Sequence, residues 1–366
     1  MKKIKKVFLI ALLTGTAMQL FGQDPNYTQF TNNPLYYNPA FTGLYTGIRA
    51  RVSFRDQWPA LPYDFKAYHF EVDLGARSLP GSGGLGLFIN RDNEGIGFIK
   101  NLNIGLSFAA RIRITELSVC QVGIKGSWLQ KSVNWDDFVF SDALDKRYGT
   151  IYESAFPRPD QNVRNMPDFG VGFVYQIANE MKSLSGTFGF SADHLFEPDQ
   201  SFLQTAKAPL PRKYVGHVEL IYAIGESNGF NVMDDNALKL NPGFIYQNQG
   251  GLTSIQAGLN LTKFGINVGV WYKGDFGSYS NSAFVVLAGY RYYIVDNLAL
   301  KFTYSYDAQM AGDLMGTGGA HEISLILDFN SENLFGGSSG RSGGIMGGQG
   351  GGRRGGNTHW ECPEFW

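Results

Sequence analysis

Cysteine is scarce in this sequence, which contains only 2 among 366 residues. A small scaffold held together by several disulfides is therefore excluded. Cys120 falls in a strand-like pattern and Cys362 lies close to the end of the chain. We interpret them as an unpaired core thiol and a tail thiol, with a disulfide or a metal pair as the alternative.

An excess of charge of either sign is also missing, because the formal net charge is −1. The sequence therefore offers no electrostatic argument for binding nucleic acid or an acidic substrate. Beyond the first 22 residues, no segment has the roughly 18 consecutive apolar residues that a membrane-spanning helix requires.

Catalytic motifs are lacking as well. There is no G-x-S-x-G elbow, no readable Ser/His/Asp arrangement, and no pair of histidines at zinc-helix spacing. Gly81, Gly83 and Gly86 fit G-x-G-x-x-G, but the residues after them alternate like a strand, whereas a dinucleotide site needs a helix there. We expect no enzyme activity and no cofactor.

The N-terminus has the three parts of a secretory signal peptide. Four lysines precede an apolar stretch over residues 7 to 13, and small and polar residues follow up to Gly22. We place cleavage after Gly22, with no cysteine beside the cut that would indicate a lipoprotein. An exported chain with 47 Gly, 28 Phe and 19 Tyr is then either a secreted β-sandwich or an outer-membrane β-barrel.

Alternation of apolar and polar residues favours the barrel. One run is longer than the usual soluble strand of about 5–6 residues and reaches the 9–11 that a tilted transmembrane strand needs. Its apolar positions are Leu102, Ile104, Leu106, Phe108, Ala110, Ile112 and Ile114. We therefore predict an all-β fold, a transmembrane outer-membrane barrel of about 14 antiparallel strands over residues 46 to 329.

The predicted strands begin near Thr46, Asp64, Gly83, Lys100, Glu116, Met166, Leu184, Arg212, Leu238, Leu252, Phe264, Ser282, Leu298 and Ala320. Short and long gaps between them largely alternate, as periplasmic turns and extracellular loops do. The stretch from 225 to 251 breaks this order and contains Pro242, so one strand there could be wrongly assigned.

Two segments flank the predicted barrel. Residues 23 to 45 contain three prolines and several aromatics, and we expect an ordered strap that packs in or under the periplasmic mouth and occludes the pore. Residues 330 to 366 form a glycine-rich tail that ends in a candidate partner-docking motif of Trp360, Phe365 and Trp366. An even strand count predicts that both termini are periplasmic.

Charged residues on neighbouring predicted strands form a candidate polar ladder inside the lumen. Its members are Arg49, Arg51, Arg55, His69, Glu71 and Asp73. We expect the arginines of the first predicted strand and the carboxylates of the second to neutralise each other, because buried unpaired charge is very costly. In the longest loop, Asp136, Asp137, Asp142 and Asp145 are either a solvated acidic cluster or a Ca²⁺ site, although their spacing matches no EF-hand.

Several strings resemble the PorP/SprF family of outer-membrane proteins, which is associated with type IX secretion and gliding motility in Bacteroidota. They are the N-terminal segment with Gln29, Phe30, Asn38 and Pro39, the Gln57-Trp58-Pro59 string, and the strings around Asp307 and Glu322. The resemblance covers residues 23 to 329, whereas the tail from Asn330 departs from many relatives. It implies a barrel with the general architecture of the fatty-acid transporter FadL.

The resemblance also implies a non-enzymatic role in moving a cargo, such as a surface adhesin or its C-terminal secretion domain, to the cell surface. Partners would be that cargo, outer-membrane lipid and components of the secretion and gliding apparatus. The alternative function is a porin or transporter for a small or hydrophobic solute. An open polar lumen would favour the alternative, and a plugged lumen would favour the cargo-binding role.

Overall fold

The structure is a computed structural model that describes residues 24–62, 65–75, 83–95, 99–145, 147–155, 158–159, 161–179, 183–203, 207–224, 237–275, 278–295, 297–310 and 315–329. The predicted signal peptide and the predicted C-terminal docking motif lie outside the described residues. In the described part of the chain, no helix is both long enough and apolar enough to cross a membrane.

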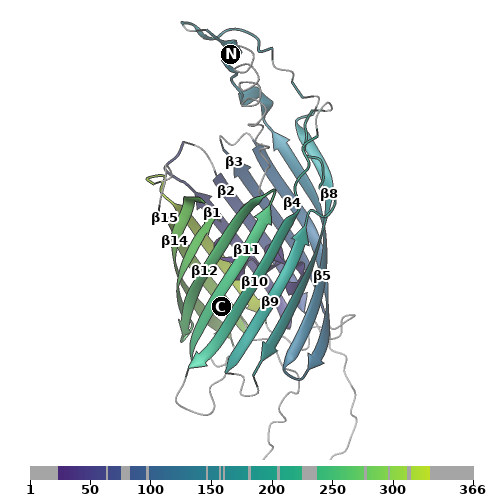
Figure 1. Ribbon diagram of the computed structural model, residues 1–366, viewed down its shortest axis with the longest axis vertical. Helices are drawn as coiled ribbons and strands as arrows, with labels where there is room; N and C mark the ends of the chain where they lie inside the picture. The colour runs from purple at the N-terminus through teal and green to yellow at the C-terminus, as the bar shows by residue number, and fades with distance from the viewer. Residues whose placement is uncertain are drawn as a thin grey trace, which may run out of the picture.

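Fourteen antiparallel strands close into a single barrel, which confirms the predicted fold class (Figure 1). The barrel strands are β1 (Gly47–Gln57), β2 (Phe65–Gly75), β3 (Gly84–Glu94), β4 (Ile99–Thr115), β5 (Ser118–Val133), β8 (Val163–Ala178), β9 (Leu184–Asp193), β10 (Lys213–Ile224), β11 (Leu238–Gln249), β12 (Leu252–Lys263), β13 (Ile266–Asp275), β14 (Ser278–Val295), β15 (Leu298–Gln309) and β16 (Ala320–Phe329).

The first and last strands pair with each other and close the barrel. Their register runs from Ile48 opposite Phe329 to Gln57 opposite Ala320. Closure leaves no unpaired sheet edge, which is what a β-structure in a bilayer requires. Along each strand, buried and exposed side chains alternate, and the exposed set is largely apolar, as on Val52, Leu106 and Phe173.

The stretch from 225 to 251, where the sequence pattern is irregular, contributes two regular strands. β10 and β11 pair with each other, and β11 pairs with β12 along its whole length. Pro242 lies where the β10–β11 register is interrupted, between the Glu219–Gly243 and Tyr222–Leu240 pairs. Proline cannot donate a backbone hydrogen bond, so the pairing is interrupted toward β10. The pairing toward β12 continues past Pro242, and β11 therefore remains a strand.

The two ends of the barrel differ in their connections. We call the end that carries the β4–β5, β8–β9, β12–β13 and β14–β15 turns the turn rim, and the opposite end the loop rim. β8 has 16 residues, and its first eight, Val163–Gly170, extend beyond its pairing with β9 at the loop rim. Together with β4 and β5, it forms one wall that rises well above the rest at this rim (Figure 1).

The β5–β8 connection extends this tall wall. It contains the short helices η4 (Trp135–Asp137) and η5 (Ser141–Ala143), followed by a small hairpin of β6 (Leu144–Asp145) and β7 (Gly149–Thr150). Trp135, Phe138 and Phe140 pack their rings together at centroid distances of 5.4 to 6.1 Å. The connection is thus a folded structure beyond the barrel.

Candidate functional site

The N-terminal segment fills the lumen. Residues 24 to 45, which we call the plug, contain η1 (Phe30–Asn32), α2 (Pro34–Tyr37) and η2 (Pro39–Phe41). Pro34 and Pro39 each lie in the first turn of a short helix, where a missing N–H costs nothing. Nearly every plug side chain is buried against the inner wall.

The upper end of the plug is fastened at the loop rim by Asp24. Its backbone N–H donates to Gln249 at 3.0 Å, and its carboxylate contacts His194 at 3.0 Å and Lys213 at 3.3 Å. Burial would raise the pKa of Asp24, but the charges of His194 and Lys213 outweigh burial and hold that pKa well below its usual range.

His194 completes this anchor from the first position after β9. Its other ring nitrogen lies 2.9 Å from Asp168. Burial alone would lower the pKa of His194, but Asp24 and Asp168 reverse this and raise it to about 10. The anchor therefore carries full charges at neutral pH.

Close to the loop rim, the plug joins a network of buried charges, because Arg55, Asp307 and Glu322 each lie two residues from the loop-rim end of their strands. Arg55 contacts Asp307 at 2.8 Å and Glu322 at 3.1 Å. The same two carboxylates accept hydrogen bonds from Thr28, and Glu322 also accepts from the backbone N–H of Gln29. Plug and wall are thus joined by charge-assisted hydrogen bonds, which are about twice as strong as neutral ones.

An aromatic core surrounds the middle of the plug. Tyr27, Phe30, Tyr36 and Tyr37 pack edge to face, and Phe30 also meets Trp271 of β13 at a centroid distance of 5.5 Å. These side chains are almost fully buried. The apolar core of this protein therefore lies in the lumen, between plug and wall.

Near the turn rim, glycines let the plug approach the wall closely. A Cβ atom on Gly123 would lie 2.4 Å from the backbone nitrogen of Ala40, and one on Gly172 would lie 1.9 Å from Oδ1 of Asn38. Below them, the backbone N–H of Gly43 donates to Asp73 at 2.9 Å, and the carbonyl of Leu44 accepts from Arg111. The chain then leaves the lumen and enters β1.

The strap was expected in or under the periplasmic mouth, and the structure places it inside the lumen, where it runs from rim to rim. The first and last described residues, Asp24 and Phe329, lie at opposite rims. The predicted periplasmic position of the two chain termini concerns residues outside the described ones, and it stays a prediction. An even strand count places the start of the first strand and the end of the last strand on the same side of the membrane. It does not determine the position of a segment before the first strand that passes back through the lumen.

The six residues of the polar ladder are all buried in the lumen. Arg51 contacts both Glu71 at 2.6 Å and Asp73 at 2.7 Å, and His69 lies 2.9 Å from Glu71. Arg49 and Arg55 reach other strands instead, Arg49 to Asp328 at 2.5 Å and Arg55 to Asp307 and Glu322. Arg51, Glu71, Asp73 and His69 thus form one connected group, while Arg49 and Arg55 form ion pairs with residues of other strands.

The residues shared with the PorP/SprF strings lie in two places. Gln29, Phe30, Asn38 and Pro39 are plug residues, and Asn38 donates to the carbonyls of Phe173 and Phe190. Gln57, Trp58 and Pro59 lie at the loop rim, where Trp58 has a positive φ of 59° and its N–H donates to Gly319 at 2.7 Å. A non-glycine residue in this conformation is strained and persists only where its surroundings hold it.

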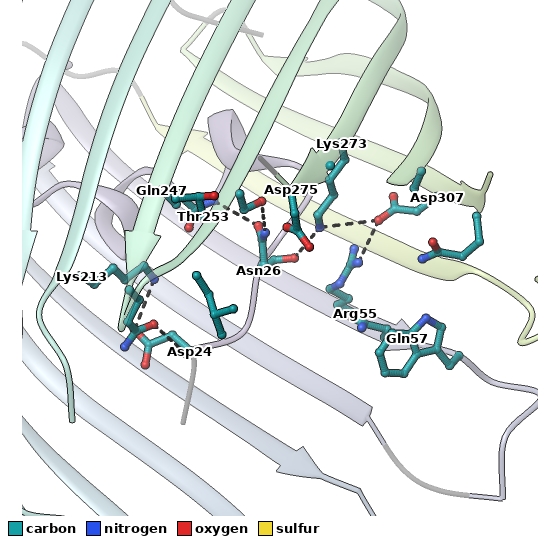
Figure 2. Close-up of a pocket in the computed structure, with 17 residues that line it drawn as sticks. Asp24, Asn26, Arg55, Gln57, Lys213, Gln247, Thr253, Lys273, Asp275 and Asp307 are labelled. Carbon is teal, nitrogen blue, oxygen red and sulfur yellow. Dashed lines mark hydrogen bonds and ion pairs between the residues drawn. The ribbon is translucent and has the colours of Figure 1, made fainter. Parts of the chain in front are cut away.

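Above the plug, the loop rim opens into a polar cavity of about 270 Å³ (Figure 2). Its floor is formed by Asp24 and Asn26 of the plug, and its wall includes three cations and two further carboxylates. The charged wall residues are Arg55, Lys213, Lys273, Asp275 and Asp307, and most of the others carry amide or hydroxyl groups. Lys273 also donates to the backbone carbonyl of Asn26 at 2.9 Å, so the cavity and the plug share contacts.

The acidic loop residues each contact a separate partner. Asp136 pairs with Arg158 and Asp137 with Asn134, while Asp142 accepts from Ser154 and Ala155. Asp145 accepts from the backbone N–H groups of Arg147 and Tyr148. Within the described residues, no group of three or more His, Cys, Asp or Glu side chains is arranged to hold a metal ion.

Sequence reasoning did not assign a site role to Asp307, Glu322, Lys273 or His194. The parity rule that selected Arg55 also places Asp307 on the polar face of its strand, so a partial signal existed. The pairing itself depends on closure of β16 onto β1, at a separation of 267 residues between Arg55 and Glu322. No local pattern reveals such a contact.

Solved outer-membrane barrels are similar at low identity. A Pseudomonas aeruginosa FadL homologue is 13% identical over 86% of this chain and 95% of its own, with a TM-score of 0.42. The Ralstonia pickettii toluene transporter TbuX is 9% identical over 81% and 94%, with a TM-score of 0.44. No curated protein sequence matches the chain.

A family described as type IX secretion system membrane protein PorP/SprF matches residues 19–327. This match includes the whole plug and nearly all of the barrel. The chain therefore belongs to the PorP/SprF family of type IX secretion system membrane proteins.

Proposed function

We propose that this barrel binds a cargo protein at its loop rim, either a surface adhesin or its C-terminal secretion domain, and supports the secretion or surface anchoring of that cargo. The observation that carries this proposal is the pairing of a filled lumen with a projecting, apolar surface. The plug occupies the path that a solute would take, and the β5–β8 connection offers a surface suited to a protein.

The projecting hairpin is unusually apolar for a loop beyond the barrel. Leu144, Tyr148, Ile151 and Tyr152 lie on or beside β6 and β7, and their side chains are 49 to 68% exposed. Exposed apolar groups that gather on an ordered element outside the bilayer favour a protein partner, because scattered surface residues do not form such a cluster. The tall wall of β4, β5 and β8 supports this hairpin from below.

In this proposal the loop rim faces the cell exterior and the turn rim faces the periplasm, as in other bacterial barrels. Components of the secretion and gliding apparatus would then meet the turn rim. The candidate docking motif of Trp360, Phe365 and Trp366 remains a prediction for that side. Ca²⁺ binding in the acidic loop remains a weaker proposal, because its carboxylates already have other partners.

The alternative function is transport of a small solute, and the polar cavity at the loop rim favours it. That cavity ends on Asp24 and Asn26, whose contacts with β10, β11, β12 and His194 would have to break before a solute could pass. We therefore rank the cargo-binding role first.

A photo-crosslinking amino acid at position 148 tests the proposal in cells that secrete type IX cargo. We expect Tyr148→crosslinker to capture a secreted protein that carries a C-terminal secretion domain, identified by mass spectrometry. The same group at Ile112, which is similarly exposed but lies near the turn rim, is the matched control and should not capture it. Normal secretion after residues 139 to 152 are replaced by a Gly/Ser linker would contradict the proposal.

A further inference from the structure

The plug runs through the lumen in one direction along the chain, from the loop rim to the turn rim. Its contacts descend the lumen in chain order, from Asp24 at the loop-rim end of β11, through Asn26 beside Ser254 near the same end of β12, to Leu35 beside Glu71 at mid-strand. The last contacts, from Gly43 to Asp73 and close to Gly75 and Gly84, lie at the turn rim. β1 then runs back toward the loop rim and ends at Gln57.

We propose that the mature chain is threaded through its own barrel, so that its N-terminus is displayed at the cell surface beside the cargo-binding loops. Only the identification of the loop rim as the surface side rests on the proposed function. The threading itself rests on the contacts of the plug. If the signal peptide ends at Gly22, the new N-terminus is one residue from Asp24.

Chain length is compatible with this path. A β1-like strand of 11 residues runs about 36 Å, and a tilt of about 45° leaves a barrel height of about 25 Å. The plug could reach more than about 70 Å if fully extended, so it can cross the lumen even though short helices shorten it.

The alternative path would bring the plug in from the turn rim as a hairpin, with both of its ends on the periplasmic side. That path requires Asp24 to lie near Gly43. Asp24 is instead held by Gln249, His194 and Lys213, which all belong to the loop rim, and its charged contacts would be lost at the other end. The buried ion cluster therefore fixes the direction of threading.

Threading also gives the N-terminus a place in the mouth cavity. Asp24 and Asn26 form the cavity floor (Figure 2). Asn26 is hydrogen-bonded to Gln247, Ser254 and Gln256. A partner that enters this cavity from outside would meet the first residues of the mature chain. The N-terminal residues are then part of the surface that the proposed cargo reaches.

Three single-cysteine variants test the threading in intact cells, in a background in which Cys120 and Cys362 are replaced by alanine. One cysteine is inserted between Gln23 and Asp24, one replaces Tyr148 at the loop rim, and one replaces Glu116 in the β4–β5 turn. Each is labelled with a membrane-impermeant maleimide before and after permeabilisation, and a shift in electrophoretic mobility on heating confirms that the barrel is folded.

We expect the inserted cysteine to label like Y148C, without permeabilisation, whereas E116C labels only after it. An inserted cysteine that labels like E116C would overturn the threading. If Y148C and E116C exchange their behaviour, the orientation in the proposed function is wrong, and the threading is still judged by which of the two the inserted cysteine follows. An insertion variant that does not fold is replaced by a wild-type N-terminus reacted with an impermeant amine reagent and mapped by mass spectrometry, with the same two outcomes.

Discussion

At the scale of single residues, Arg55 connects the plug to the seam where the barrel closes. It is 4% exposed and binds two carboxylates, on β15 and β16, as well as the hydroxyl of Thr28. Substitution of Arg55 should be strongly destabilising, because it would leave the two carboxylates buried without their cation.

We therefore predict that Arg55→Met destabilises the folded barrel by about 3–5 kcal/mol, the usual cost of breaking a buried ion pair. The measurement is urea-induced unfolding in lipid vesicles, followed by tryptophan fluorescence. In the double variant R55M/E322Q, Asp307 keeps Lys273 as a charged partner at 3.8 Å, so this variant should recover part of the loss. Equal instability of the single and double variants would argue against the ion network as the cause.

The anchor of Asp24 and His194 predicts a pH dependence. The pKa of His194 is raised to about 10 from 6.5, so its contribution to stability is complete below pH 6.5 and is lost as pH rises through about 10. The pKa of Asp24 is lowered, so its contribution is present above its ordinary pKa of 3.8 and is lost as pH falls toward its folded value.

The difference in unfolding free energy between wild type and His194→Gln isolates the histidine contribution from other titrating groups. We expect this difference to be constant from about pH 5 to 6.5 and to shrink steadily as the pH approaches 10. A difference that grows with rising pH would mean that His194 is neutral in the folded protein.

At the scale of elements, the strands could be predicted from the sequence, whereas the path of the plug through the lumen could not. Alternation with period two identified all fourteen barrel strands, because lipid on one side and a polar, packed lumen on the other impose opposite chemistry on neighbouring residues. Even β11, with Pro242 inside it, follows this pattern.

The plug has no repeating pattern, so its prolines and aromatics predicted an ordered, pore-occluding strap at the periplasmic mouth but not its path or its contacts. Its position is set by contacts with residues far along the chain, such as Thr28 with Glu322 and Asn26 with Ser254. The partners of Arg49 and Arg55 were missed for the same reason, since they lie across the β1–β16 seam or beyond it. Charge pairing between adjacent strands was visible in the sequence, and the register across the closing β1–β16 seam was not.

The fit of η2 against β5 yields a prediction at this scale. Gly123→Val should push Pro39 and Ala40 away from the wall, because even a Cβ at this position would overlap their backbone atoms. We expect the lower plug to become accessible to protease in the purified protein, while the barrel stays closed. Gly216→Val is the matched control, since a Cβ there meets nothing within 4 Å. Equal protection of the plug in both variants would contradict the close fit.

At the scale of the whole molecule, the protein is a barrel with one tall wall, a filled lumen and a tail beyond its last strand. The final strand ends at Phe329, so removal of residues 357 to 366 should leave barrel assembly intact. We expect this truncation to weaken co-purification of a partner or secretion of the cargo, because large aromatic side chains such as Trp dominate binding hot spots. Unchanged secretion and unchanged partners would show that the tail has no docking role.

The central claim is that this barrel is closed to solutes because its own N-terminal segment fills the lumen. Single-channel recording in planar lipid bilayers tests it most directly, with wild-type protein compared with a variant that lacks residues 24 to 45. We predict no stable conductance from wild type and a stable conductance from the deletion variant, whose remaining lumen is lined by charged and polar side chains such as Arg51, Glu71 and Lys301. A wild-type protein that conducts ions as readily as the deletion variant would contradict the account.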